Sequence, residues 1–459
     1  MAKKTLWETY TAEQKAAMYE YCENYRQFLS RCKTERECVT EMVRMLEAAG
    51  YRNLNDVAKN GEKLSAGDKV YANNRGKMLM AVQLGTRPLV EGLNILGAHI
   101  DSPRLDLKLN PLYEDSGLAL LKTHYYGGIK KYQWVTLPLA MHGVVAKKDG
   151  SVEDVVLGED PADPVLGISD LLPHLGKDQI TKPASEVITG EGLNVCIGSI
   201  PKEEEKEEPV KKAVLELLSE KYGMEEDDFL SSELEIVPAG PARDYGLDRS
   251  MILGYGHDDR ICAYTSLTAM LDTPEVEKTM VGLFTDKEEI GSVGATGMHS
   301  HFFENAVAEI MAACGEYSDL GLRRTLAASK MLSSDVSVAY DPNFPEVSER
   351  NNTAYFGRGP VLHKFTGSRG KSGSNDATSE YIAELRKIFA EDDVTFQMAE
   401  LGRVDQGGGG TIAYILAEYN MDVIDMGIAL HSMHAPYEVA SKIDTYEAYR
   451  AYLTFLRKM

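Results

Sequence analysis

The sequence lacks the features that would assign it to several large classes of protein. Its 459 residues include 49 Lys and Arg against 71 Asp and Glu, a formal net charge of −22, which argues against nucleic-acid and anionic-membrane partners because these bind basic surfaces. No apolar run approaches the length of a membrane span, and the opening residues, MAKKTLWETYTAEQK, contain no apolar leader. We therefore expect a cytoplasmic protein with no nucleic-acid partner and no membrane partner.

Cysteine is scarce, and the common enzyme signatures are missing. The six cysteines, scattered from Cys22 to Cys314, form no CxxC pair, which argues against a zinc ribbon or a small disulfide-bonded secreted domain and favours reduced thiols. The glycine-rich stretches GSRGKSGSND and DQGGGGTIAYIL match neither a phosphate loop nor a dinucleotide-binding turn. Neither a GxSxG nucleophile elbow nor an HEXXH zinc motif is present, so a serine hydrolase or a common single-zinc peptidase is not indicated.

The chain is too long for one ordinary hydrophobic core, and its character changes in the middle. From about Pro103 to Arg243, short β-like runs, glycine, proline and charge replace the alternation of helices and strands. We interpret this stretch as an inserted domain. Elsewhere the sequence predicts two capped helices within Thr11–Gly50, a hairpin over Val70–Leu84 and a capped helix from Thr445 to the end.

A predicted strand, Leu93 to Ile100, delivers His99 and, just beyond it, Asp101. Residues two apart on a strand share a face, so the imidazole and the carboxylate converge on one site or on each other. A metal-bound histidine commonly donates its second ring N–H to a carboxylate, and Asp101 is placed for that role. The alternative is a buried histidine beside a local capping aspartate.

Another predicted buried strand, Val281 to Phe284, leads into the adjacent carboxylates Glu288 and Glu289. The breaker pair Gly291-Ser292 follows at once, so the two acids lie on a loop at the carboxyl end of a strand. Open α/β sheets place their ligands there. One carboxylate could bind a metal while the other faces a bound water. A solvated acidic turn is the alternative and the commoner case.

Three further candidate ligands occur in similar settings. Asp258 stands beside Asp259 at a predicted helix start, where it could bridge two cations or simply cap the helix; Asp335 and His434 lie near strand ends. Two imidazoles and three carboxylates suit Zn²⁺, with Co²⁺ or Mn²⁺ possible on ligand type, and five ligands suit two ions about 3.5–4 Å apart. Glu288 is then free to act as general base on water. The five candidate ligands are His99, Asp258, Glu289, Asp335 and His434.

Five motifs in register resemble those of the aspartyl aminopeptidase family of di-zinc metallopeptidases, and the resemblance covers nearly the whole chain. These motifs are GAHIDSPRLDLK, GHDDR, TDKEEIGS, SSDVSVAYDPN and ALHSMHAPYE. Asp101 resembles the residue that orients the metal-binding histidine, and Glu288 resembles the general base. The resemblance implies two sets of metal ligands, namely His99, Asp258 and Asp335 for one ion and Glu289, Asp258 and His434 for the other.

The resemblance also implies a fold and an assembly. Residues 1–101 and 245–459 would form a discontinuous α/β catalytic domain with a central mixed sheet flanked by helices, and residues 102–244 an inserted β-rich dimerisation domain. Family members build dodecameric shells from dimers. His174 stands among apolar neighbours, a setting typical of a structural histidine, yet it resembles a histidine that reaches the partner subunit's active site. Lys364 resembles a substrate-contacting lysine.

The chain departs from the family pattern at three places. Animal members have a histidine where it has Val338, Lys371 stands at or near the place of a substrate-contacting tyrosine, and the usual Leu-Asp-Asn reads His257-Asp258-Asp259. These departures leave the metal ligands in place and leave the preference for acidic N-terminal residues open. We expect a metal-dependent aminopeptidase that removes single N-terminal residues from peptides. The alternatives are an N-acyl-amino-acid deacylase on the same scaffold and a non-catalytic shell protein.

Overall fold

The computed structural model describes residues 4–459, which divide into two compact units. The large unit comprises the described residues up to Asp101, together with Ala242–Met433 and Glu438–Met459. The small unit comprises Ser102–Pro241 and the short segment His434–Tyr437. No helix among residues 4–459 is long and apolar enough to cross a membrane.

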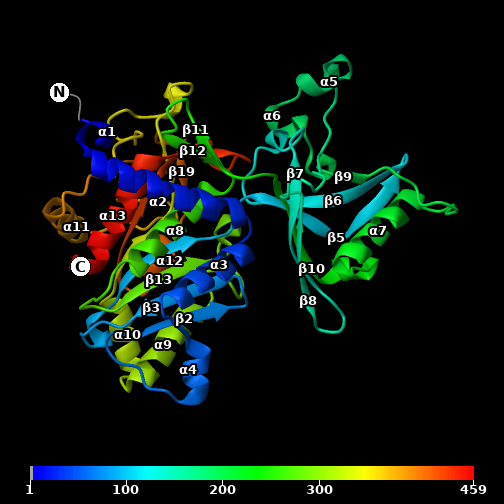
Figure 1. The fold of residues 1–459 in the computed structure, drawn as a ribbon. Helices are drawn as coiled ribbons and strands as arrows, with labels where there is room; N and C mark the ends of the chain where they lie inside the picture. The colour runs from blue at the N-terminus through cyan, green and yellow to red at the C-terminus, as the bar shows by residue number, and fades with distance from the viewer. Residues whose placement is uncertain (1–3) are drawn as a thin grey trace. The chain divides into compact units, whose positions relative to one another are not determined.

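A nine-stranded mixed sheet forms the centre of the large unit (Figure 1). Strands β13, β4, β14 and β20 run parallel to one another, whereas β3 and β16 run antiparallel to the neighbours that flank this group. The central strands read as continuous apolar runs because both faces of the sheet are covered. In spatial order the strands are β1 (Arg52–Asn53), β2 (Lys69–Asn74), β3 (Met78–Gln83), β13 (Met280–Thr285), β4 (Asn94–His99), β14 (Lys330–Ser333), β20 (Asp422–Gly427), β16 (Val361–His363) and β18 (Gln397–Met398).

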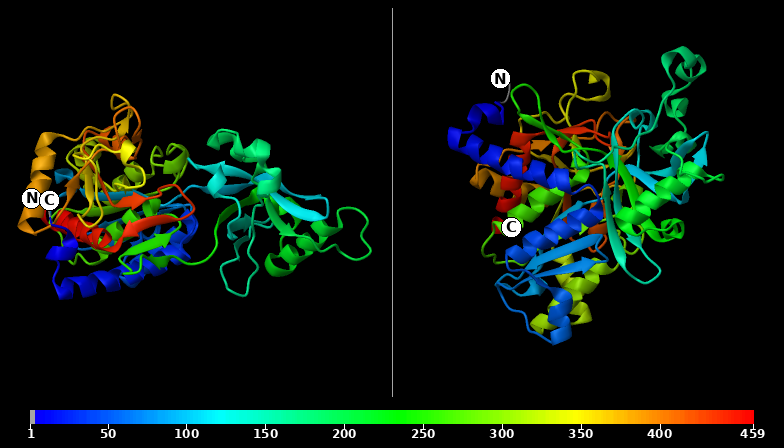
Figure 2. Two further views of the ribbon diagram at one scale, coloured as in Figure 1. Left: turned by 90° about the horizontal axis from the view of Figure 1, so that it is seen from above. Right: turned by 45° about the vertical axis from the view of Figure 1, so that its right-hand side comes forward.

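Helices cover both faces of this sheet, and alternate residues of each strand face opposite cores. In β3, Leu79 and Ala81 join one core, while Met78, Met80 and Val82 join the other. Helices α2 and α13 lie side by side over the first core (Figures 1 and 2). The first core includes residues of α2 (Ala12–Arg31), α3 (Glu35–Ala48), α8 (His257–Leu271), α11 (Ser379–Glu391) and α13 (Lys442–Lys458), and the second includes residues of α4 (Leu54–Asn60), α9 (Phe302–Cys314), α10 (Asp319–Ala327) and α12 (Ala413–Ala417).

The predicted capped helices at the start of the chain are confirmed. The hydroxyls of Thr11 and Thr34 accept hydrogen bonds from the third residue of α2 and α3 respectively, and Gly50 adopts a φ of 86° just beyond α3. The predicted hairpin over Val70–Leu84 is also confirmed, as β2 and β3. The prediction for the last helix was wrong in its starting residue and in its cap. It begins at Lys442, and its N-cap makes no side-chain hydrogen bond.

A second, five-stranded sheet completes the large unit. It has the order β11-β12-β22-β21-β15. Its strand β22, which directly precedes the last helix of the chain, pairs with β12, the strand that precedes α8. Its strands are β11 (Arg243–Tyr245), β12 (Met251–Gly254), β22 (Glu438–Ser441), β21 (Ala429–His431) and β15 (Ser337–Val338). Further short elements of this unit include α1 (Leu6–Thr9), β17 (Gly367–Ser368) and β19 (Gly408–Gly409).

The small unit is built on a six-stranded antiparallel sheet, with α7 packed against four of its strands. The predicted turn at Lys148–Gly150 joins two of these strands, β7 and β8. In spatial order the strands are β8 (Val152–Leu157), β7 (Leu139–Ala146), β10 (Ser232–Pro238), β5 (Arg104–Asp115), β6 (Leu118–Tyr126) and β9 (Val195–Gly198). The helices are α5 (Lys177–Ile180), α6 (Ala184–Val187) and α7 (Pro209–Tyr222). The mixed sheet covered by helices, together with this β-rich unit, confirms the predicted α/β fold class.

Candidate metal centre

His99 is the last residue of β4, and it is buried among carboxylates. Its Nε2 lies 3.0 Å from Oδ1 of Asp258. Its Nδ1 faces Asp101, at 2.9 Å from the Asp101 backbone carbonyl oxygen and 3.3 Å from the Asp101 Oδ1. Burial by itself would lower the pKa of His99, but the Asp101 and Asp258 carboxylates outweigh it and raise that pKa well above its usual range. The ring is therefore held between two acids.

Asp101 also holds the turn that carries the two glutamates. Strand β13 runs parallel to β4, so both strands end at the same edge of the sheet. Beyond β13, the backbone N–H groups of Glu288 and Glu289 donate to Oδ1 and Oδ2 of Asp101, each at 3.2 Å. Oε2 of Glu288 lies 4.0 Å from Nε2 of His99. One carboxylate thus orients the imidazole and fixes the glutamate turn.

Asp258 and Asp259 open α8, where both depart from helical backbone angles. Their side chains are buried, and the backbone N–H of Asp258 donates to Oε2 of Glu438 at 3.0 Å. Burial raises the pKa of Asp259 well above its usual range. Asp258 points its carboxylate at His99, with Oδ1 3.0 Å from the imidazole Nε2.

Asp335 lies between β14 and β15, close to the other acids. The pKa of Asp335 is raised well above its usual range, first because the side chain is partly buried and then because the nearby Asp259 and Glu288 carboxylates repel its negative charge. The backbone on its other side is tightly packed, because a Cβ atom at Gly427 would lie 1.7 Å from the Asp335 carbonyl oxygen. Glycine is needed there to let the two backbones approach.

The donor set of the large unit fits a divalent metal. His99, Asp258 and Asp335 place one ligand atom each within 4.8 Å of one another, and so do His99, Glu288 and Glu289. Mixed imidazole and carboxylate ligands are those that Zn²⁺ takes in catalytic sites. Several acids crowded around one histidine form the electrostatic setting that a bound cation neutralises.

The structure places the other predicted residues in different surroundings. His434 belongs to the short segment of the small unit, where its Nδ1 lies 2.9 Å from the Gly128 carbonyl oxygen. His174 lies in the small unit within a 3₁₀ turn, Pro173–Leu175, and is exposed rather than enclosed in an apolar core.

Lys364 follows β16 in the large unit and takes part in a small charged group. Its Nζ is hydrogen-bonded to Asp376, and Nζ of Lys371 lies 3.2 Å from the other oxygen of the same carboxylate. The Lys371 ammonium also stands 3.7 Å from the centre of the Phe365 ring. Two lysines thus share one acid, which leaves one positive charge in the group.

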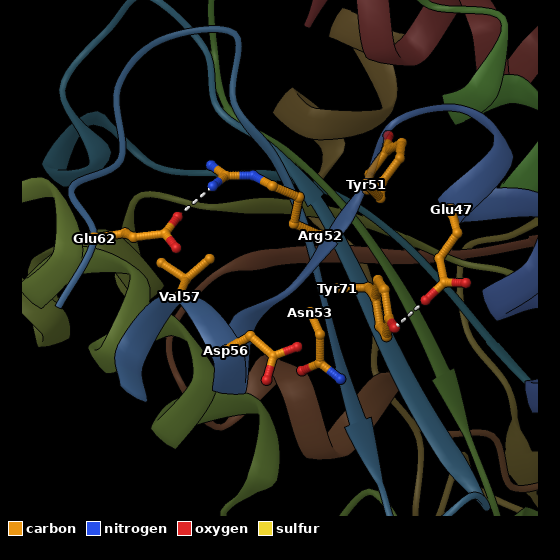
Figure 3. A pocket seen from close by; sticks show the side chains of 8 residues that line it. All are labelled: Glu47, Tyr51, Arg52, Asn53, Asp56, Val57, Glu62 and Tyr71. Carbon is orange, nitrogen blue, oxygen red and sulfur yellow. Dashed lines mark hydrogen bonds and ion pairs between the residues drawn. The ribbon is translucent and has the colours of Figure 1, made fainter. Parts of the chain in front are cut away.

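A hollow of about 360 Å³ lies elsewhere in the large unit, beside β1 and β2 (Figure 3). None of the predicted site residues lines it. An Arg52–Glu62 ion pair and a hydrogen bond from the Tyr71 hydroxyl to Glu47 (2.7 Å) engage four of its lining residues. It therefore contributes nothing to the cluster around His99.

Two features of this centre were not predicted from the sequence. One is Glu438, which reaches the backbone of Asp258 because β22 pairs with β12 in antiparallel register. The other is the pair of hydrogen bonds that the Asp101 carboxylate accepts from the backbone N–H groups of Glu288 and Glu289. Both contacts join residues about 180 positions apart or more, and no local motif signals such pairings.

Comparison with known proteins identifies the family. The family model described as "Aminopeptidase I zinc metalloprotease (M18)" matches residues 28–456. A probable M18 family aminopeptidase 1 from Clostridium acetobutylicum is 60% identical over 454 residues, which cover 99% of this chain and 98% of that protein. The crystal structure of an M18 aminopeptidase from Thermotoga maritima matches with a TM-score of 0.95 at 45% identity, covering 100% of both chains.

A second crystal structure, of aminopeptidase I from Clostridium acetobutylicum, matches with a TM-score of 0.93 at 57% identity and covers 100% of both chains. The resemblance read from the five motifs is confirmed by these relatives. The chain belongs to the M18 family of zinc metalloproteases and is an aminopeptidase of that family, a hydrolase of peptide bonds.

Proposed function

We propose that the protein removes single N-terminal residues from peptides with Glu288 as general base. The observation that carries this proposal is the position of the Glu288 carboxylate, 4.0 Å from the imidazole of His99, on a turn whose N–H groups are held by Asp101. Glu288 is only partly buried, so water and substrate can reach it. Its carboxylate takes a proton from the attacking water and returns it to the nitrogen of the leaving amine.

The metal ligands are those that the family resemblance implies. His99, Asp258 and Asp335 would hold one ion, and Glu289, Asp258 and His434 the other, with zinc the first choice and cobalt or manganese possible. When bound, the ions lower the pKa of water and polarise the scissile carbonyl. Asp101 fixes the orientation of the His99 ring and also keeps Glu288 in reach of the water.

The proposed recognition of the substrate depends on the charges of its amino terminus and of its N-terminal side chain. The free amino terminus of a peptide is a cation, and the site carboxylates are acceptors for it. A net positive charge in the group of Lys364, Lys371 and Asp376 supports a preference for an N-terminal Asp or Glu, with Lys364 as the contacting residue.

The proposed assembly follows the family as well. We propose residues 102–244 as a dimerisation domain and a dodecamer built from dimers, in the cytoplasm. The structure of a Saccharomyces cerevisiae relative, mApe1, 21% identical with a TM-score of 0.74, is described as a dodecamer. Exposure of His174 is compatible with a contact to the partner subunit's active site.

The test is hydrolysis of a panel of peptides with N-terminal Asp, Glu, Leu, Ala or Lys by metal-depleted protein, with Zn²⁺, Co²⁺ or Mn²⁺ restored. Metal-dependent preference for Asp and Glu is the expected result. Cleavage of neutral residues instead would keep the aminopeptidase and overturn the acidic preference. Cleavage of N-acylated but not free peptides would indicate a deacylase, and no cleavage with any metal would indicate an inert shell.

A further inference from the structure

A group of buried charges lies behind the glutamate turn, and the function proposed above does not use it. Glu35, at the start of α3, and Asp286, just beyond β13, are both fully buried. The ammonium of Lys77 lies 2.8 Å from Oε1 of Glu35 and 3.9 Å from Oδ2 of Asp286. Two buried acids thus share a lysine whose side chain is only 11% exposed.

Strand pairing explains why Lys77 is there. In the antiparallel pair of β3 and β13, Leu79 lies opposite Phe284. Continuing this register by two residues places Lys77 opposite Asp286, so the side chains of the two lie on the same side of the ribbon. Helix α3 packs against β3 and brings Glu35 to the same point.

Asp286 in turn anchors the segment that carries the catalytic glutamate. The Thr296 hydroxyl donates to its carboxylate at 2.5 Å, and the Asp286 backbone N–H donates to the Thr296 carbonyl at 3.3 Å. Lys287, the next residue, adopts a left-handed φ of 69°. A non-glycine residue in that conformation needs support from its surroundings. The turn is therefore held at one end by Asp286 and at the other by Asp101.

We propose that Lys77 is a positioning residue for catalysis, which acts through Asp286 to keep the Glu288 turn in place. The proposal rests on Glu288 being the general base. The Lys287 ammonium also lies 3.3 Å from Oδ2 of Asp286, but Lys77 is the cation that faces both carboxylates, so removing it increases the repulsion between these two buried acids. Asp286 would then have to move or take up a proton, and either change would release the turn from one of its two anchors.

The experiment compares Lys77→Met with Lys77→Arg and with a matched control, Lys442→Met. Lys442 is a lysine of similar burial, with a side chain 7% exposed, and its ammonium lies 2.7 Å from Asp244, outside the cluster around His99. The readouts are kcat, KM, zinc content and melting temperature. Glu288→Gln is measured in parallel, so that a failure of the proposed base is recognised separately.

The expected result is a kcat about 10- to 100-fold lower for Lys77→Met, with KM, zinc content and folding unchanged, as for other residues that orient catalytic groups. Lys77→Arg should recover most of the activity, and Lys442→Met should retain it. A kcat for Lys77→Met equal to that of the control, or a loss that follows loss of zinc, would overturn the proposal. Should Glu288→Gln remain active, the base assignment fails first.

A second variant keeps the test decisive if Lys77→Met does not fold. Thr296→Val removes only the hydroxyl that donates to Asp286 and leaves Lys77 in place. We expect it to lower kcat several-fold at unchanged zinc content. An unchanged kcat in this variant would overturn the anchoring role of Asp286.

Discussion

Two pairs of adjacent acidic residues near His99 lie at different depths. Asp258 and Asp259 are 3% and 0% exposed at the start of α8, whereas Glu288 and Glu289 are partly exposed on a 3₁₀ turn. Their backbone N–H groups also have different acceptors, Glu438 for Asp258 and Asp101 for both glutamates.

The difference shows that pairs of chemically similar residues can meet different surroundings within one site. A deeply buried carboxylate is costly to ionise unless a cation or a hydrogen-bond donor faces it, so Asp258 suits a metal ligand. A half-buried carboxylate on a held turn can meet water and substrate, as a general base must. The following substitutions test this contrast.

The largest expected effect comes from the buried pair. Asp258→Asn should lose zinc and lower turnover by more than the roughly 10- to 100-fold that an orienting residue costs, because it removes the proposed bridging carboxylate. Asp259→Asn should retain zinc. Metal analysis and kcat on the two variants decide the matter, and equal zinc loss in both would remove the distinction between the neighbours.

Gly427→Ala should disturb the backbone next to Asp335. The added methyl would lie 1.7 Å from the Asp335 carbonyl oxygen, so the backbone that carries this proposed ligand has to move. We expect a loss of about 1–3 kcal/mol in the free energy of unfolding, together with weaker zinc binding. Gly167→Ala, where the nearest atom is 3.5 Å away, is the control. Wild-type zinc affinity in Gly427→Ala would contradict the account.

Another buried acid, Asp425 in β20, tests whether depth alone makes a ligand. Burial raises its pKa from 3.8 to about 7, although the hydroxyls of Thr411 and Ser333 oppose the shift. The folded state therefore binds this proton up to about pH 7 and the unfolded chain does not, so the residue's contribution to stability falls as the pH rises between 3.8 and 7.

Asp425→Asn should consequently gain stability relative to the wild type between pH 4 and pH 8, by up to about 4 kcal/mol, at unchanged zinc content. Chemical denaturation at several pH values measures this difference. His363, opposite Asp425 in β16, has a pKa lowered by burial to about 4, so its effect runs the other way and is present in both proteins. A constant difference across the pH range would contradict the prediction.

Features set by residues close together in the chain could be predicted from the sequence, whereas contacts between distant segments could not. The capping boxes at Thr11 and Thr34, and the strands that precede His99 and Glu288, follow from residues a few positions apart. The contact of Glu438 with Asp258 and the pairing of Lys77 with Asp286 do not, because they arise from strand register between distant segments. Depth of burial, which separates the two acid pairs, also depends on the whole fold.

The smallest expected effect lies far from both acid pairs. Thr11→Ala removes the hydroxyl that caps α2 and should cost about 1 kcal/mol of stability, seen as a lower melting temperature, with kcat unchanged. A large fall in kcat would mean that α2 influences the centre in a way that this account omits.

The most direct test compares Glu288→Gln with Glu289→Gln, two neighbours with one chemical change. Zinc content and kcat are measured on both proteins. We predict that Glu288→Gln keeps the wild-type zinc content while turnover falls about 10²- to 10⁴-fold, and that Glu289→Gln loses zinc. A Glu288→Gln protein that remains active, or that loses zinc as Glu289→Gln does, would contradict the central claim that Glu288 is the base and Glu289 the ligand.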